Sequence, residues 1–149
     1  MKKLYAGLLT ALLAFPTLAA GPTTQAVNSP ASSLGNLTAY SVQINAIADA
    51  ATIAIPSYVT AYQVTAFKIT NCSGTPILGS VGLYTAASAG GTAVVTPATI
   101  TGATASSVVL SQTIASSARI TAATLYIRVA VANAASLTCD MKVAIEDLS

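Results

Sequence analysis

The chain has 149 residues, which is the usual length of one domain. Only 7% of the residues are charged and 54% are hydrophobic, so the surface must be built largely from small polar and apolar side chains. Lys2 and Lys3 account for the net charge of +2, and beyond residue 20 the cations and anions balance. This argues against nucleic acid as a direct partner, because phosphate binding needs clustered cations.

Residues 1–20 have the pattern of a secretory signal: two lysines, an apolar run from Leu8 to Phe15, and small residues at Ala19 and Ala20. The alternative is an assembly arm that packs against a neighbouring subunit. The apolar run is shorter than the roughly 20 residues that cross a bilayer, so we expect no permanent membrane anchor. Residues 21–38 are rich in Pro, Ser, Thr, Gly and Asn, which predicts a flexible linker.

Residues 39–149 are predicted to form a β-sandwich domain, because Val, Ile, Thr and Tyr are frequent there and apolar residues recur with a period of two. Turn residues separate the segments, and Pro97 is expected to stop one of them. The predicted strands are 40–47, 52–55, 58–71, 76–85, 92–96, 107–112, 123–131 and 137–146.

This pattern predicts an all-β fold: an antiparallel two-sheet sandwich of about eight strands, of jelly-roll or Greek-key type, preceded by the short apolar N-terminal segment. The Ala-rich stretches 86–89 and 115–123 are interrupted by Ser, Thr and Gly, so no helix is expected in the body.

The sequence contains no histidine, which removes the usual catalytic base and most zinc and copper sites. Glu146 and Asp147, with Asp140 nearby, are the only carboxylate cluster, and adjacent strand residues point to opposite faces. We interpret them as a solvated chain end, with a weak calcium site at Asp140 and Glu146 as the alternative. We therefore expect no enzyme, no catalytic residue, no cofactor and no metal.

Cys72 and Cys139 could form one disulfide or could be two buried thiols, and their spacing does not decide between these alternatives. Tyr58, Tyr62, Tyr84 and Tyr126 are the candidate interface aromatics. They could also fill the core or stack sugars, although the absence of Trp weakens the sugar interpretation.

Four segments of Phe67–Ser149 carry a resemblance: residues 69–73 (ITNCS), 82–94 (GLYTAASAGGTAV), 121–126 (TAATLY) and 143–149 (VAIEDLS). This part of the chain resembles small proteins encoded in the structural gene modules of tailed phages and prophages. The resemblance implies a sandwich-fold virion component, such as a capsid decoration protein, and carries over no functional residue.

We therefore expect a non-enzymatic structural protein of a phage particle, which binds and stabilises or decorates the capsid. Its partners would be the major capsid protein or another virion protein, and copies of itself in a homo-oligomer. The alternative is an exported bacterial adhesin or carbohydrate-binding module, located in the periplasm or at the cell surface after removal of residues 1–20.

Overall fold

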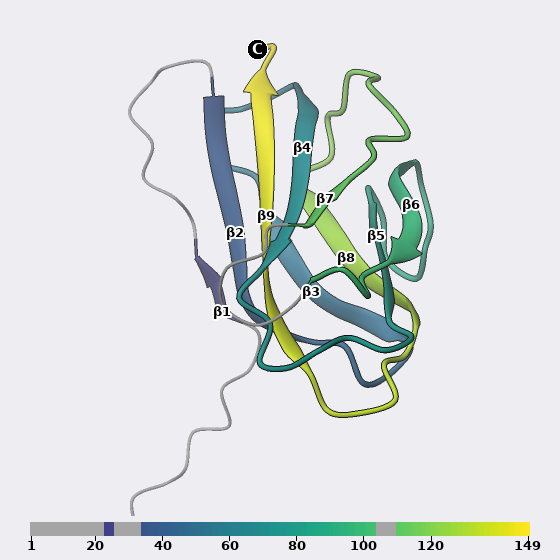
Figure 1. Ribbon diagram of the computed structural model, residues 1–149. Helices are drawn as coiled ribbons and strands as arrows, with labels where there is room; N and C mark the ends of the chain where they lie inside the picture. The colour runs from purple at the N-terminus through teal and green to yellow at the C-terminus, as the bar shows by residue number, and fades with distance from the viewer. Residues whose placement is uncertain (1–22, 26–33, 104–109) are drawn as a thin grey trace, which may run out of the picture.

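A computed structural model describes residues 23–25, 34–103 and 110–149, and every regular element in them is a β-strand (Figure 1). The expected all-β class is thereby confirmed. The strands are β1 (Thr23–Gln25), β2 (Leu34–Gln43), β3 (Ala48–Ala54), β4 (Tyr62–Thr70), β5 (Ser80–Tyr84), β6 (Ala93–Thr99), β7 (Leu110–Gln112), β8 (Thr124–Val131) and β9 (Thr138–Asp147).

The strands form two antiparallel sheets, a larger one in the order β1-β2-β9-β4-β7 and a smaller one in the order β3-β8-β5-β6. Leaving the short β1 aside, strands that are consecutive in the chain take corresponding places in the two sheets. β2 corresponds to β3, β9 to β8, β4 to β5 and β7 to β6. This is the strand order of a jelly roll, in which a long antiparallel ribbon is wrapped into a sandwich.

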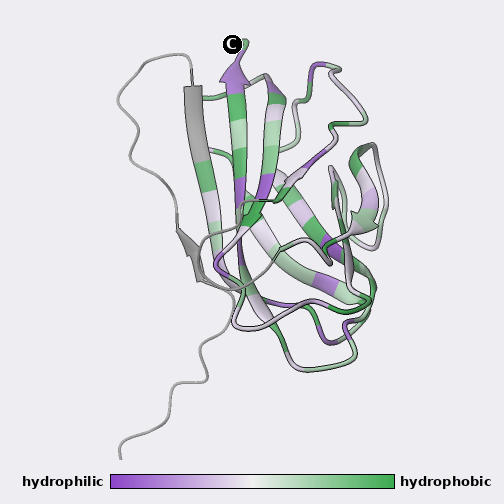
Figure 2. Cartoon of the chain, in the orientation of Figure 1, coloured by the Kyte–Doolittle hydropathy of each residue, from purple (hydrophilic) through white to green (hydrophobic). Residues whose placement is uncertain are grey.

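The alternation of apolar and polar residues decides which side of each strand faces the core. In β9, Cys139, Met141, Val143 and Ile145 are buried, and the residues between them face outward. Hydrophobic and hydrophilic bands accordingly alternate along β9 and β4 in Figure 2. The core between the sheets is continuous, and its largest buried side chains include Leu37, Phe67, Leu83, Leu125 and Ile127.

The predicted linker over residues 21–38 is wrong at its C-terminal end. β2 begins at Leu34, and its residues from Leu34 to Ala39 pair with β9. The sequence did not predict this strand because Leu34 and Leu37 are separated by Gly35 and Asn36, which are poor strand formers. The three residues of β1 also fall inside the predicted linker, whereas residues 1–20 lie outside the described residues.

Pro97 does not end its strand, because β6 continues to Thr99. β6 is an edge strand, and the register with β5 shifts around this point: Val81 pairs with Ala98 and Leu83 with Val95. An edge position and a bulge both tolerate the missing N–H of proline. Gly82 faces the bulge, and a Cβ there would lie only 2.9 Å from the Val95 carbonyl oxygen, so the close approach requires glycine.

Tyr62 should make the stability of the fold sensitive to alkaline pH. Its ring is buried, its hydroxyl donates a hydrogen bond of 2.9 Å to the Ala122 carbonyl, and burial raises the pKa of Tyr62 from 10.0 to about 12. The folded state therefore holds this proton more tightly than the unfolded chain, and the resulting stabilisation is complete below pH 10 and lost as the pH rises through 12.

Tyr62→Phe should cost about 1 kcal/mol at neutral pH through loss of the hydrogen bond. It should also flatten the fall in stability between pH 10 and 12, as measured by urea unfolding at a series of pH values. Tyr58→Phe is the control, since this ring is exposed. An equal alkaline loss in Tyr62→Phe and the wild type would contradict the assignment.

Candidate functional site

Four of the large exposed hydrophobic residues lie together at one end of the sandwich. Val131, at the end of β8, is opposite Ser80 at the start of β5, and Ile47 directly precedes β3, which pairs with the same part of β8. Ile77 and Leu78 lie in the loop that leads into β5. We call this set, Ile47 (63% exposed), Ile77 (57%), Leu78 (61%) and Val131 (47%), the loop-end patch.

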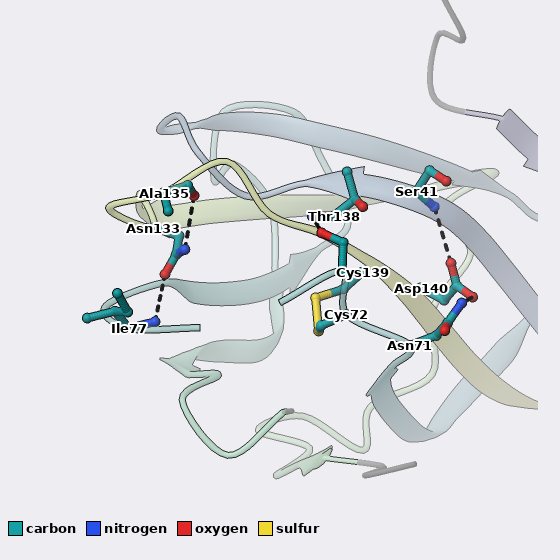
Figure 3. The surroundings of a disulfide bond; sticks show 10 residues. Ser41, Asn71, Cys72, Ile77, Asn133, Ala135, Thr138, Cys139 and Asp140 are labelled. Carbon is teal, nitrogen blue, oxygen red and sulfur yellow. Dashed lines mark hydrogen bonds between the residues drawn. A yellow bond between two sulfur atoms is a disulfide. The ribbon is translucent and has the colours of Figure 1, made fainter. Parts of the chain in front are cut away.

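The loops that carry the loop-end patch are held by one buried side chain, Asn133. Its Oδ1 accepts hydrogen bonds from the backbone N–H groups of Ile77 (2.8 Å) and Leu78 (3.3 Å), and its Nδ2 donates to the Ala135 carbonyl at 3.0 Å. Its own N–H donates to the Ile44 carbonyl. In Figure 3 the side-chain amide of Asn133 lies between Ile77 and Ala135. The segments before β3, before β5 and after β8 are therefore fixed to one another.

A disulfide braces the same end of the larger sheet. Cys72, just after β4, is bonded to Cys139, the second residue of β9, across a sequence separation of 67 residues. Next to it, the Asp140 carboxylate accepts hydrogen bonds from the Ser41 N–H (3.2 Å) and from Asn71 Nδ2 (3.1 Å) (Figure 3). Ser41 and Asn71 both have positive φ, so the carboxylate stabilises two irregular backbone positions.

A second surface is the outer face of the larger sheet, where register brings two cations together. Lys68 of β4 and Lys142 of β9 are directly opposite each other, and both are exposed. They border a shallow hollow of about 280 Å³, whose other lining residues are Thr38, Tyr40, Ala66 and Ala144. The small side chains of Ala66 and Ala144 form its floor. The sequence predicted scattered cations, and the structure places these two side by side.

The four predicted interface aromatics do not form one site. Tyr62 points into the core, so it cannot meet a partner, because it begins β4 on the inward face. Tyr58 lies in the loop before β4 and is exposed at the opposite end from the loop-end patch. Tyr84 and Tyr126 are a cross-strand pair on the smaller sheet, with Tyr84 buried and Tyr126 half-buried. Of these four, Tyr58 alone presents an exposed ring.

Glu146 and Asp147 lie on opposite faces of β9, and Asp140 and Asp147 form hydrogen bonds within the chain. Asp147 accepts a hydrogen bond of 2.9 Å from the Ser149 N–H, and its hydrogen bonds with Ser149 lower the pKa of the Asp147 carboxyl. Asp140 and Glu146 are six residues apart along β9, which is about 20 Å, so they cannot share one calcium ion. In the described part of the chain, no three His, Cys, Asp or Glu residues are grouped as metal ligands.

Comparison with known proteins gave no further information on this site: no family model, curated protein or solved structure matches the chain. The described ranges also contain no helix of the length and hydrophobicity that a membrane span requires.

Sequence reasoning missed Asn133 and the loop-end patch. The segment 132–136 (ANAAS) looks like any polar turn, and nothing in it signals that the asparagine is buried. The patch could have been suspected from Ile77 and Leu78, since two large apolar residues directly after Pro76 precede the glycine of a turn. Their exposure nevertheless depends on contacts with loops more than 50 residues away.

Proposed function

We propose that this chain is a non-enzymatic structural module that binds another protein through the loop-end patch, as an accessory protein of a tailed-phage particle. The observation that carries the proposal is the exposure of four large apolar side chains on loops and a strand end that a buried amide and a disulfide hold in place. Apolar groups exposed together on a rigid scaffold are typical of protein interaction sites.

The patch could supply a substantial part of a binding energy. Fully burying an exposed Val, Leu or Ile side chain contributes about 1.5–3 kcal/mol, and since these four are already about half covered, each would contribute roughly half of that before the cost of association is subtracted. Because the loops are already ordered by Asn133 and the disulfide, little further conformational entropy is lost on binding. On a symmetric particle, many such modest contacts act together.

The phage setting rests on the resemblance of residues 67–149 and on the jelly-roll strand order, which recurs in viral capsid and lectin domains. The strand order is an argument by analogy, since one fold serves many functions. The partner expected in this setting is the major capsid protein or another virion protein.

Replacing two apolar side chains of the patch should abolish attachment without unfolding the module. In Ile77→Ser/Leu78→Ser the backbone N–H groups that bond Asn133 remain, so the fold should be retained. We expect at least a tenfold loss of incorporation into particles, measured by quantitative mass spectrometry of purified particles.

Tyr58→Ser is the matched control, because it removes an equally exposed large side chain (60%) at the other end of the sandwich. Its incorporation should equal that of the wild type. Circular dichroism and thermal unfolding confirm that all variants are folded. Incorporation of the folded Ser variant at the wild-type level would show that the patch is not the docking surface.

A second candidate function is an exported adhesin or carbohydrate-binding module, which the signal pattern of residues 1–20 favours and with which the disulfide is compatible. Disulfides persist in oxidising surroundings, which include secreted proteins, the periplasm and virion surfaces, so the bond suits both settings. Mass spectrometry of the native protein separates the two: a mature start near Ala20 or Gly21 supports export, and an intact chain in particles supports the particle function.

A further inference from the structure

The charges on the outward residues of β9 are ordered so that a second, antiparallel copy of the same strand would place opposite charges against each other. Asp140, Lys142, Ala144 and Glu146 follow one another on the outer face of the larger sheet, at intervals of two residues. The order along the strand is therefore negative, positive, neutral, negative. If two such strands are stacked face to face in opposite directions about Ala144, each Lys142 meets the Glu146 of the other copy.

Lys68 adds a second positive charge beside Lys142, so that this part of the face carries excess positive charge within one copy. It lies directly opposite Lys142, and like charges at opposed positions of neighbouring strands destabilise a sheet. In the described part of the chain, Arg128 and Asp49 form the one ion pair, so no carboxylate lies within 4.0 Å of either ammonium group. The carboxylate of Asp140 already accepts hydrogen bonds from Ser41 and Asn71.

The small side chains at the centre of this face would allow the sheet of a second copy to approach closely. Ala66 and Ala144 are opposite each other in β4 and β9, and they form the floor of the 280 Å³ hollow beside the two lysines. Two sheets pack about 10 Å apart, a distance that Lys and Glu side chains span from opposite sides. Tyr40, which is 39% exposed at the rim, provides an aromatic ring that a second sheet would cover.

From this charge order we infer that the outer face of β2, β9 and β4 is a twofold interface with a second copy of this chain. The two copies of β9 run antiparallel across it, the alanines meet at the axis, and Glu146 of each copy contacts Lys142 and Lys68 of the other. The interface uses the larger sheet alone and leaves the loop-end patch free. It therefore goes beyond the proposed function, and either proposal can fail without the other.

Charge reversal tests the interface, with sedimentation equilibrium of the full chain as the readout. The wild type should dimerise, and the dimer should weaken in 0.5 M salt because the pairs lie near the surface. Lys142→Glu should weaken dimerisation about tenfold, since it turns two attractive pairs into repulsive ones, and Glu146→Lys should weaken it further, since its contacts with both Lys142 and Lys68 make four pairs repulsive. Arg119→Glu is the matched control: it changes the net charge as Lys142→Glu does, at an exposed loop position, and should leave the dimer unchanged.

The decisive measurement is the mixture of the two single variants. A Lys142→Glu copy and a Glu146→Lys copy are complementary to each other at both Lys142–Glu146 positions and lose only one of the two contacts with Lys68. The mixture should therefore form a heterodimer that is tighter than the homodimer of either variant. A wild type that stays monomeric to millimolar concentration would overturn the inference, as would a mixture that associates no better than either variant alone. Equal effects of Lys142→Glu and Arg119→Glu would overturn it as well.

Discussion

Loss of the Cys72–Cys139 disulfide should lower the free energy of unfolding by about 4 kcal/mol. The bond closes a loop of 67 residues, and the loss of chain entropy in the unfolded state for a loop of this size gives that value. The expected effect is a large share of the roughly 5–15 kcal/mol that stabilises a domain. The reduced protein should therefore be only marginally stable.

The measurement is guanidinium unfolding of the wild type with and without reductant, compared with Cys72→Ala/Cys139→Ala. The double variant should match the reduced wild type and should not respond to reductant, which separates loss of the bond from other effects of the reagent. An unfolding midpoint that reductant leaves unchanged in the wild type would show that the bond does not brace this end of the sandwich.

Asn133→Ala should cost about 3 kcal/mol and should also weaken attachment to the partner. The substitution removes the acceptor of the Ile77 and Leu78 N–H groups and the donor to the Ala135 carbonyl. Asn133 itself is 4% exposed, so water cannot readily replace the lost partners, and each buried group left unpaired costs about 1–3 kcal/mol. The loop before β5 should loosen, which raises the entropic cost of binding through the patch.

Asn71→Gly is the matched control for this substitution, because glycine tolerates the positive φ of Asn71. It removes an asparagine side chain at the same end of the sandwich whose hydrogen bond to Asp140 is exposed, so less than about 1 kcal/mol should be lost. Amide hydrogen exchange of Ile77 and Leu78 should rise in Asn133→Ala and not in Asn71→Gly. Equal stabilities and equal exchange in the two variants would contradict the role of Asn133.

The fold was predictable because its main signal is local. The alternation of buried and exposed residues in 124–131 and 138–147 follows directly from the period of a strand, and glycine and proline mark most of the turns. The prediction failed where a tertiary contact outweighed local preference. Leu34 to Leu37 pair with β9 despite an unfavourable composition, and Pro97 is accommodated by a bulge on an edge strand.

The candidate surfaces were much less predictable, because they depend on register and on loop contacts. Lys68 and Lys142 are 74 residues apart in sequence (142 − 68), and only the pairing of β4 with β9 places them opposite each other. The burial of Asn133 depends on backbone groups from two other loops. Tyr62 could have been expected in the core from its place in the alternating pattern with Val64, whose side chain is also buried.

The proposed role as a built-in component of a phage particle can be tested by the copy number of the chain in purified particles. Particles should be banded twice in a density gradient and analysed by mass spectrometry with labelled reference peptides, with the major capsid protein as the internal standard. We expect an intact chain at a fixed, symmetry-related ratio to that protein in every preparation. Absence of the chain from particles, or a ratio that falls with each round of purification, would contradict it.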